Sequence, residues 1–221
     1  MENIKVLSIE FITRDVVQIL AEKPENFDFV PGQAADISLN KEGWQNEKRP
    51  FTFTSLPDDK FLQFTIKTYP ERNGVTNVLR TFRKNDEMII HEVFGAIAYQ
   101  GEGTFIAGGA GITPFISIFR SLKAKNALGS NRLLFANKTR DDIVMKYEFE
   151  HILGKNFINI LSDEKTGEYD HGFINDDFLR TNITDIMKPI YLCGPPPMME
   201  AVEGMLMRMN INERSIVKEA V

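Results

Sequence analysis

The stretch Phe105-Ile-Ala-Gly-Gly-Ala-Gly-Ile-Thr-Pro114, near the middle of the 221-residue chain, decides how the fold is organised. A short apolar run leads into three glycines, and Thr113 and Pro114 follow, which are residue types favoured at the start of a helix. Glycines let the backbone come close to a phosphate group, and a helix N-terminus supplies N–H donors and a positive dipole end. The stretch therefore predicts a phosphate site, although a tight strand-to-helix turn explains the same residues.

From residue 104 onward, short apolar runs alternate with amphipathic segments, which predicts a parallel sheet with helices on both faces. Strands are predicted at 104–108, 132–136, 157–161, 189–193 and 215–219, and helices at 114–125, 142–153, 176–180 and 196–209. A second glycine turn, Cys193-Gly-Pro-Pro-Pro-Met198, follows one of these strands. Ligands bind at the carboxyl ends of such strands, so both turns are expected to face one crevice. A buried structural thiol is the other interpretation of Cys193.

Residues 1–99 have a different pattern, with short alternating strands separated by turns. Strands are predicted at 16–20, 36–39, 62–67 and 88–90, and a short helix at 77–82 with Thr76 as its N-cap. This spacing favours a small antiparallel barrel or sandwich. The pattern changes near residues 95–103, which predicts two domains, 1–99 and 100–221.

Composition excludes several classes of function. The chain is 43% hydrophobic and 26% charged with a net charge of −5, as in ordinary soluble proteins. Neither predicted domain is basic, which argues against a nucleic-acid partner. The absence of an 18-residue apolar run or a signal peptide argues against a membrane span and favours the cytoplasm. Cys193 is the single cysteine, so this chain has no internal disulfide and no four-cysteine iron–sulfur cluster, and we expect no metal site.

Motifs from both halves, taken in order, resemble those of the ferredoxin–NADP reductase superfamily. They are Arg49-Pro-Phe-Thr52, Gly74-Val-Thr76, Gly109-Ala-Gly-Ile-Thr-Pro114 and Cys193-Gly-Pro-Pro196, and the resemblance extends from about residue 31 to residue 219. It implies a six-stranded antiparallel β-barrel that binds a flavin, followed by an α/β domain that binds a nicotinamide nucleotide. The implied cofactor is bound FAD rather than FMN, with NADH or NADPH as the substrate.

The resemblance also implies a role for each motif. Arg49 pairs with the flavin phosphate, Phe51 packs on the isoalloxazine ring, and Thr52 hydrogen-bonds to flavin N5. From the residues alone, an aromatic core stripe is the favoured explanation of Phe51, and only the assembled motifs favour a flavin contact. Cys193 is implied to lie beside nicotinamide C4, and Glu219 to approach the flavin, although a frayed terminal acid explains Glu219 as well. Thr52, Cys193 and Glu219 are thus the predicted catalytic residues.

The cofactor-binding set that the resemblance implies is larger than these three residues. It consists of Arg49, Pro50, Phe51, Thr52, Ile66, Lys67, Gly74, Val75, Thr76, Gly109, Ala110, Gly111, Thr113, Pro114, Asn137, Ser162, Asp163, Cys193, Gly194 and Pro195.

Ser162-Asp-Glu164 bears on the choice between NADH and NADPH. By resemblance, NADPH users often carry Ser followed by Arg at this strand end, whereas here Asp163 follows Ser162. A carboxylate repels a 2′-phosphate and accepts a hydrogen bond from a free ribose 2′-hydroxyl, which favours NADH. Lys138, Arg140 and Lys165 are near enough in sequence to supply positive charge, and a solvated loop is the plainest alternative.

The resulting hypothesis is an FAD-dependent oxidoreductase that takes hydride from NAD(P)H and passes single electrons to a separate carrier such as flavodoxin or ferredoxin. An NAD(P)H:free-flavin reductase and a non-catalytic electron-transfer subunit of a larger complex are the alternatives. A positive rim for an acidic carrier is one interpretation of several cations on the first domain, and scattered solvated charges are the other: Lys48, Arg49, Lys67, Arg72, Arg80 and Arg83.

Overall fold

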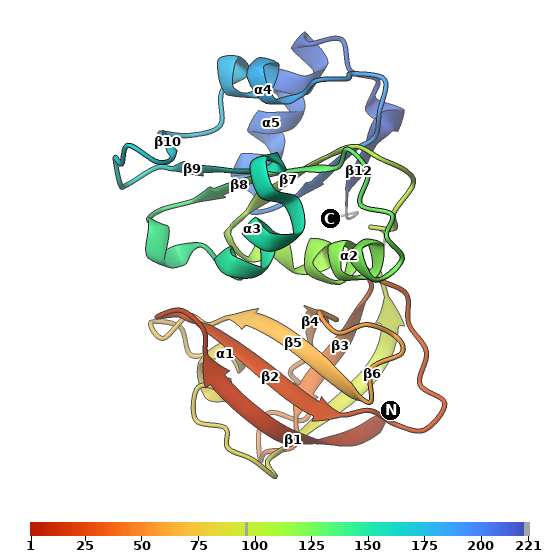
Figure 1. The fold of residues 1–221 in the computed structure, drawn as a ribbon. Coiled ribbons are helices and arrows are strands. Elements are labelled where there is room, and N and C mark those ends of the chain that lie inside the picture. Colours follow the sequence, from red (N-terminus) through yellow and green to blue (C-terminus); the bar gives the residue numbers. More distant parts are fainter. Residues whose placement is uncertain (96, 219–221) are drawn as a thin grey trace. The chain divides into compact units, whose positions relative to one another are not determined.

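The computed structural model describes residues 1–95 and 97–218, and the chain divides into two compact units (Figure 1). One unit comprises Met1–Ala98 together with Thr113–Ser121, and the other comprises Tyr99–Ile112 and the chain from Leu122 onward. Within the described residues, none of the helices is both long and apolar enough to cross a bilayer.

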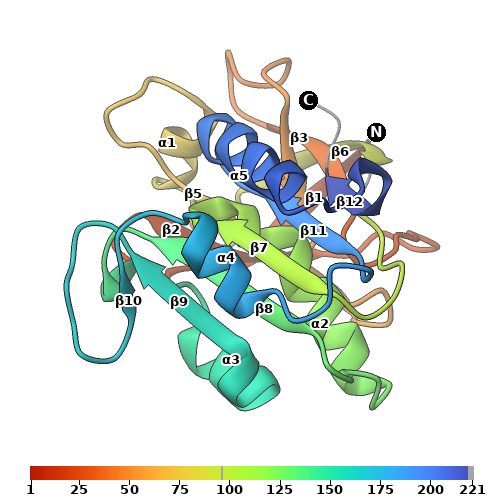
Figure 2. The same ribbon diagram turned by 90° about the horizontal axis from the view of Figure 1, so that it is seen from above.

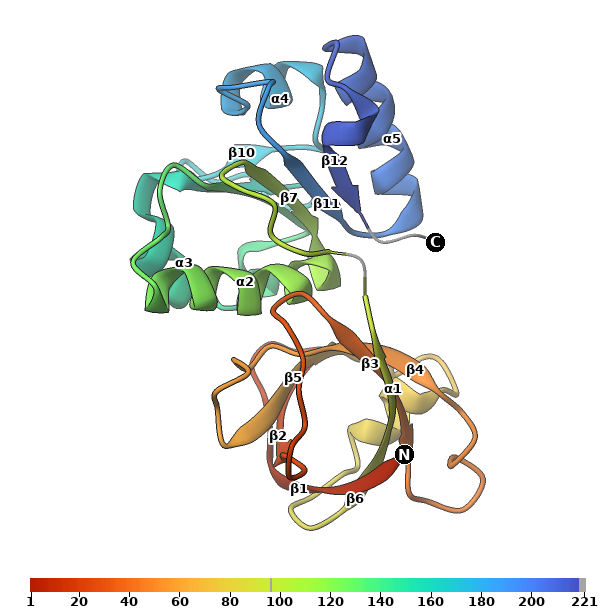
Figure 3. The same ribbon diagram turned by 90° about the vertical axis from the view of Figure 1, so that its right-hand side faces the viewer.

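The first unit is built on a six-stranded antiparallel sheet. Its strands are β1 (Glu2–Phe11), β2 (Val16–Glu22), β3 (Ala34–Leu39), β4 (Arg49–Thr52), β5 (Phe61–Lys67) and β6 (Glu87–Phe94), in the order β4-β3-β6-β1-β2-β5. A bridge between Phe53 and Phe64 joins the two edges and closes the sheet into a barrel (Figure 3). The predicted six-stranded barrel is confirmed.

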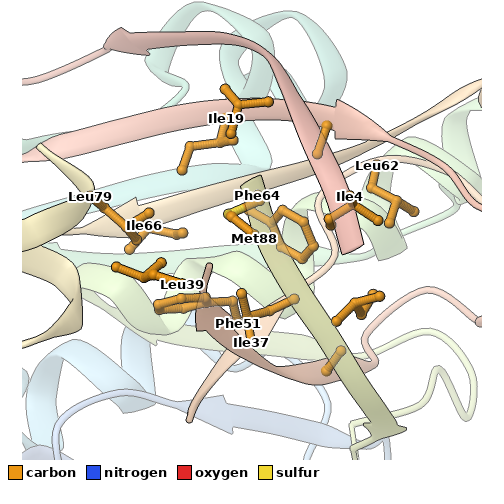
Figure 4. Packing of buried hydrophobic residues seen from close by; sticks show 14 of the residues in the cluster. Ile4, Ile19, Ile37, Leu39, Phe51, Leu62, Phe64, Ile66, Leu79 and Met88 are labelled. Carbon is orange, nitrogen blue, oxygen red and sulfur yellow. The ribbon is translucent and has the colours of Figure 1, made fainter. Parts of the chain in front are cut away.

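Apolar side chains from all six strands fill the barrel (Figure 4). Ile19, Phe64 and Met88 are completely buried there. β1 is absent from the predicted strands, because only Ile4 and Val6 of its ten residues are buried and its alternation is short. The helix predicted at 77–82 is instead α1 (Val75–Leu79). Its N-cap is Gly74 without a side-chain cap, so the prediction of Thr76 as N-cap is wrong.

The first unit also includes the beginning of α2 (Thr113–Ala124). Ser117 Oγ accepts a hydrogen bond from the Gly32 backbone N–H at 3.0 Å. Arg120 donates through Nη1 to the carbonyl oxygen of Thr54 at 2.6 Å. These long-range contacts assign part of a helix to the barrel unit, which hydrophobic periodicity along the sequence does not predict.

The second unit contains a six-stranded parallel sheet in the order β10-β9-β8-β7-β11-β12. The strands are β7 (Thr104–Gly108), β8 (Arg132–Asn137), β9 (Phe157–Leu161), β10 (Asp170–His171), β11 (Ile190–Cys193) and β12 (Ile216–Lys218). α4 (Asp176–Asn182) and α5 (Pro196–Arg208) cover one face, as Figures 1 and 2 show. α3 (Lys146–Leu153) lies on the other, where the Phe149 ring contacts that of Phe157. The predicted parallel sheet with helices on both faces is confirmed.

The remaining differences from the predicted elements have local causes. The helix predicted from residue 142 begins at Lys146, because Met145 adopts a left-handed conformation with φ of 55°. Residues Arg140–Asp142 form a separate 3-10 turn, capped reciprocally by Thr139 and Asp142. β10 is absent from the predicted strands, since its two residues are exposed and carry no hydrophobic signal.

Candidate functional site

The two glycine turns of the second unit lie against each other. β7 and β11 are neighbouring parallel strands, with Ala107 paired to Cys193, so both strands end at the same edge of the sheet. A Cβ added to Gly111 would lie 2.2 Å from the Cys193 carbonyl oxygen. A Cβ added to Gly108 would lie 2.2 Å from Met198 Sδ. Gly111 requires glycine because its turn meets the backbone of the opposing turn, whereas the space beside Gly108 is filled by the side chain of Met198.

Gly109 differs from its neighbours, since its Cβ position faces open space. Its φ is +50°, which favours glycine, and no atom of the described residues lies within 4 Å of the Cβ position. The 3-10 turn Gly109–Ile112 then leads directly into α2, which begins at Thr113, one residue earlier than predicted. The combination of a glycine with open space beside it and a following twelve-residue helix fits a phosphate group.

Asn137, Ser162 and Asp163 come together where β8 and β9 end. The Ser162 N–H donates to the Asn137 carbonyl at 3.0 Å, and the Asp163 N–H donates to the Lys138 carbonyl at 2.9 Å. Ser162 Oγ donates to Asp163 Oδ1 at 2.6 Å. Asn137 Nδ2 is buried and has no hydrogen-bond partner in the part of the chain that the structure describes. Such a donor costs about 1–3 kcal/mol unless a partner satisfies it, so this strand end fits a polar ligand.

Arg140, which follows this strand end, is held by a carboxylate. Its Nε donates to Glu164 Oε1 at 2.6 Å, and its backbone N–H donates to Glu164 Oε2 at 2.8 Å. The backbone N–H and then the guanidinium of Arg140 lower the pKa of the Glu164 carboxyl below its ordinary value. Both groups are accessible to water, which screens the pair. The sequence placed Arg140 among the possible phosphate ligands but did not predict this partner.

On the barrel, Arg49 begins β4 with its side chain 48% exposed. Its Nη2 lies 3.4 Å from Glu47 Oε2, and its Nη1 donates to the Lys48 carbonyl at 2.6 Å. Pro50 is exposed and Thr52 is half-buried at the end of the strand. An exposed guanidinium with only a long ion pair to a nearby carboxylate fits a phosphate ligand, which an arginine fork binds with charge-assisted hydrogen bonds.

Phe51 lies in the barrel core with 9% of its surface exposed. The structure thus places Phe51 in the aromatic core of the barrel, and the stacking of its ring on a flavin stays a prediction. Ile66 is also in this core, and Lys67 Nζ lies 3.0 Å from Asp15 Oδ2. Gly74, at the start of α1, has open space around its Cβ position among the described residues.

The remaining predicted catalytic residues differ in what the structure shows of them. Cys193 is half-buried at the end of β11, beside Gly111. Glu219 lies outside the described residues. Gly194 and Pro195 flank Gly108 and so belong to the same pair of glycine turns.

Most cations of the expected positive rim have local partners. Lys67 pairs with Asp15, and Arg49 pairs with Glu47. Arg72 lies 4.9 Å from the centre of the Tyr69 ring, and Arg80 lies 4.9 Å from that of Phe11. Arg83 donates to the Phe82 carbonyl at 2.7 Å. These partners favour the interpretation of scattered surface charges.

Comparison with family models connects this geometry to known proteins. Residues 1–104 match the model described as an FAD-binding domain, and residues 105–204 match the model described as an oxidoreductase NAD-binding domain. The chain belongs to the ferredoxin–NADP reductase superfamily. The two family models therefore confirm the cofactors that the motifs predict, which are FAD and a nicotinamide nucleotide.

Curated reductases of this superfamily are similar over most of the chain. It is 28% identical over 220 residues to the reductase component of propane 2-monooxygenase from Mycolicibacterium goodii, covering 91% of this chain and 62% of the relative. It is 28% identical over 190 residues to NADH-cytochrome b5 reductase 3 from Mus musculus, covering 69% of this chain and 63% of the relative. The chain thus spans about three fifths of the length of these relatives.

Solved structures of the superfamily share the fold. The FAD/NAD-binding domain of nitric oxide dioxygenase from Vibrio cholerae has a TM-score of 0.87 at 19% identity, covering 99% of this chain and 98% of that one. A ferredoxin NADP+ reductase from Neisseria gonorrhoeae has a TM-score of 0.84 at 16% identity, covering 99% and 97%. These matches confirm a barrel followed by a parallel α/β sheet.

Proposed function

We propose that the protein is an FAD-dependent NAD(P)H oxidoreductase that delivers single electrons to a separate acceptor. The observation that carries the proposal is the pair of abutting glycine turns at the ends of β7 and β11, in a chain whose barrel presents Arg49 and Thr52 on β4. The names of the matched relatives, which are reductases and reductase components, support the same reaction class.

The proposed work of this chain is to bind and orient the two nucleotides. Arg49 holds the flavin phosphate, because its planar and permanently charged fork suits that ligand. The backbone of the two glycine turns receives the nicotinamide nucleotide, with Cys193 beside the reacting end. Thr52 holds a hydrogen bond at the reacting edge of the flavin. When bound, FAD supplies the chemistry, since it accepts a hydride and releases electrons one at a time.

We propose NADH rather than NADPH as the preferred donor. Asp163 follows Ser162 at the end of β9 and accepts a hydrogen bond from it at 2.6 Å. A carboxylate at this strand end suits a ribose 2′-hydroxyl and repels a 2′-phosphate, which carries close to two negative charges. The name of one relative, an NADH-cytochrome b5 reductase, is in keeping with this preference.

The proposed acceptor is a separate one-electron carrier in the cytoplasm, such as flavodoxin or ferredoxin. The single cysteine of this chain cannot hold an iron–sulfur cluster of the four-cysteine kind, so within this chain the flavin is the proposed source of single electrons. The relatives named for oxygenase systems and for cytochrome b5 support a carrier protein as the class of acceptor.

The purified protein tests this proposal directly. We expect mass spectrometry of the released flavin to identify FAD, and the protein to reduce a dye with NADH. Arg49→Ala is expected to lose flavin on gel filtration, whereas Arg72→Ala, a control that removes an arginine lying over the Tyr69 ring, keeps it. If FMN is the only flavin released, the proposal that the protein binds FAD is wrong. A colourless protein that reduces only added free flavin would establish the flavin-reductase alternative, and a failure to oxidise NADH or NADPH would favour the non-catalytic one.

A further inference from the structure

We propose that Glu164 is a specificity-determining residue that excludes NADPH by occupying Arg140, the arginine next to the expected ribose site. This inference rests on the proposed function, because it assigns the selectivity of that nucleotide site. The proposed role of Asp163 is to repel a 2′-phosphate directly. Glu164 acts differently, because it engages Arg140, a cation that a 2′-phosphate would otherwise bind.

The two residues are held at the strand end that carries Asn137 and Asp163. Backbone hydrogen bonds join the turn after β8 to the turn after β9, from Ser162 to Asn137 at 3.0 Å and from Asp163 to Lys138 at 2.9 Å. Two residues past Lys138, Arg140 meets Glu164, which is the residue next to Asp163. Arg140 is therefore the guanidinium that the fold brings to this ligand-binding edge of the sheet.

Glu164 uses both of its carboxylate oxygens on Arg140. Oε1 accepts from the guanidinium Nε at 2.6 Å, and Oε2 accepts from the backbone N–H at 2.8 Å. The hydrogen bond from the backbone N–H holds the carboxylate in place, and the charge-assisted hydrogen bond from Nε holds the guanidinium against it. The backbone carbonyl of Glu164 lies 3.1 Å from His171 Nδ1, as does that of Leu161, so the turn that presents the carboxylate is itself anchored to β10.

A glutamate carboxyl is already ionised at neutral pH, and the hydrogen bonds from Arg140 lower its pKa further. A 2′-phosphate would have to displace Glu164 from Arg140 and would leave that carboxylate beside the new anion. NADH carries no such group and does not require the exchange. The side chain of Arg140 is 52% exposed and that of Glu164 is 27% exposed, so a free Arg140 is able to reach a ligand from the surface.

The test compares binding of 2′,5′-ADP with binding of 5′-AMP by calorimetry, and kcat/KM for NADPH with that for NADH. In Glu164→Gln we expect the preference for the 2′-phosphorylated ligand to rise about tenfold in both measurements, or about 1.4 kcal/mol, because Arg140 becomes free to bind the phosphate. Arg140→Ala alone is expected to change the two ratios less than twofold, because Arg140 is already engaged. The double variant Glu164→Gln/Arg140→Ala is expected to lose the tenfold increase.

Glu168→Gln is the matched control. It removes one negative charge nearby, but Glu168 pairs with Lys146 at 3.5 Å and makes no hydrogen bond to Arg140 among the described residues. We expect its ratios to stay within twofold of the parent. Equal increases in Glu164→Gln and Glu168→Gln would overturn the inference and show a general charge effect.

Unchanged ratios in Glu164→Gln, or an increase that persists in the double variant, would also overturn the role of Arg140. These outcomes leave the proposed function intact if the parent still oxidises NADH and binds 5′-AMP. A parent that does neither would reject the proposed function and this inference together. Equal melting temperatures of the variants and the parent establish that the ratios compare folded proteins.

Discussion

At the scale of single residues, Arg49, Thr52 and Phe51 illustrate how far a motif alone predicts a site. Arg49 and Thr52 are exposed or half-buried on β4 and retain polar groups for a ligand. Phe51, from the same motif, has its ring in the barrel core. Alternation places Phe51 and Thr52 on opposite faces of β4, and Arg49 lies at the exposed start of the strand. The motif is therefore both a core element and a ligand edge, and the sequence does not predict how much of Phe51 is left to contact a flavin.

Thr52→Ala tests the proposed hydrogen bond to the flavin. We expect the protein to fold and bind FAD, with reduction by NADH slowed by up to about tenfold, because a hydrogen bond is worth about 0.5–1.5 kcal/mol. Stopped-flow absorbance measures the rate, and Thr52→Ser is the control that restores the hydroxyl. A reduction rate equal to that of the parent in Thr52→Ala would remove Thr52 from the reacting edge.

Cys193→Ala tests the residue at the end of β11. We expect hydride transfer to slow more than nucleotide affinity falls, because the proposed position of Cys193 is beside the reacting end of the nicotinamide. Single-turnover reduction at saturating NADH measures transfer, and calorimetry with NAD+ measures affinity. Normal transfer combined with weakened affinity would reassign Cys193 to binding.

The ion pair between Arg140 and Glu164 is the feature of this site that sequence analysis missed. The two residues are 24 positions apart in sequence, and they meet because neighbouring parallel strands end at the same edge. In the sequence, the two residues are only two of several charged side chains near one strand end, and nothing in their types predicts that they pair. Asn137 and Asp163, by contrast, were predicted as site residues from the family resemblance, and the structure brings both to that edge.

At the scale of elements, buried strands were predicted more accurately than exposed ones. The strands β7, β8 and β9 are short apolar runs buried on both faces, and their predicted and observed bounds agree within one residue. β1 and β10 expose most of their residues, so they lacked the pattern on which such predictions depend. The start of α3 was missed because a left-handed residue, Met145, separates it from a short 3-10 turn.

Gly111→Ala tests the packing of the two glycine turns. The added Cβ would lie 2.2 Å from the Cys193 carbonyl oxygen and 2.7 Å from the Gly194 Cα, both on the opposing turn. Because backbone must shift, we expect a loss of about 1–3 kcal/mol in the free energy of unfolding, together with weaker NAD+ binding. Denaturant unfolding and calorimetry measure the two effects.

Gly167→Ala is the control for that substitution. No described atom lies within 4 Å of its Cβ position, and its φ lies outside the left-handed region. We expect its stability and NAD+ affinity to equal those of the parent. If Gly111→Ala behaved in the same way as this control, the two turns would not be packed at backbone distance in solution.

At the scale of the whole molecule, the order of the motifs predicted the family and the two-part architecture. A barrel with a flavin motif followed by a parallel sheet with glycine turns is the arrangement that the family models and solved structures share with this chain. The assignment of Thr113–Ser121 to the barrel unit was not predictable, because it depends on long-range hydrogen bonds such as that of Ser117 with Gly32, which are 85 positions apart.

An anaerobic titration with NADH, followed by the absorbance of the bound flavin, is the sharpest test of the proposed oxidoreductase. We expect the purified protein to carry FAD, and about one equivalent of NADH to bleach it completely, since each hydride transfer delivers two electrons to one flavin. NADPH should bleach it more slowly. A protein whose bound flavin stays oxidised after excess NADH and excess NADPH would contradict the proposed oxidoreductase.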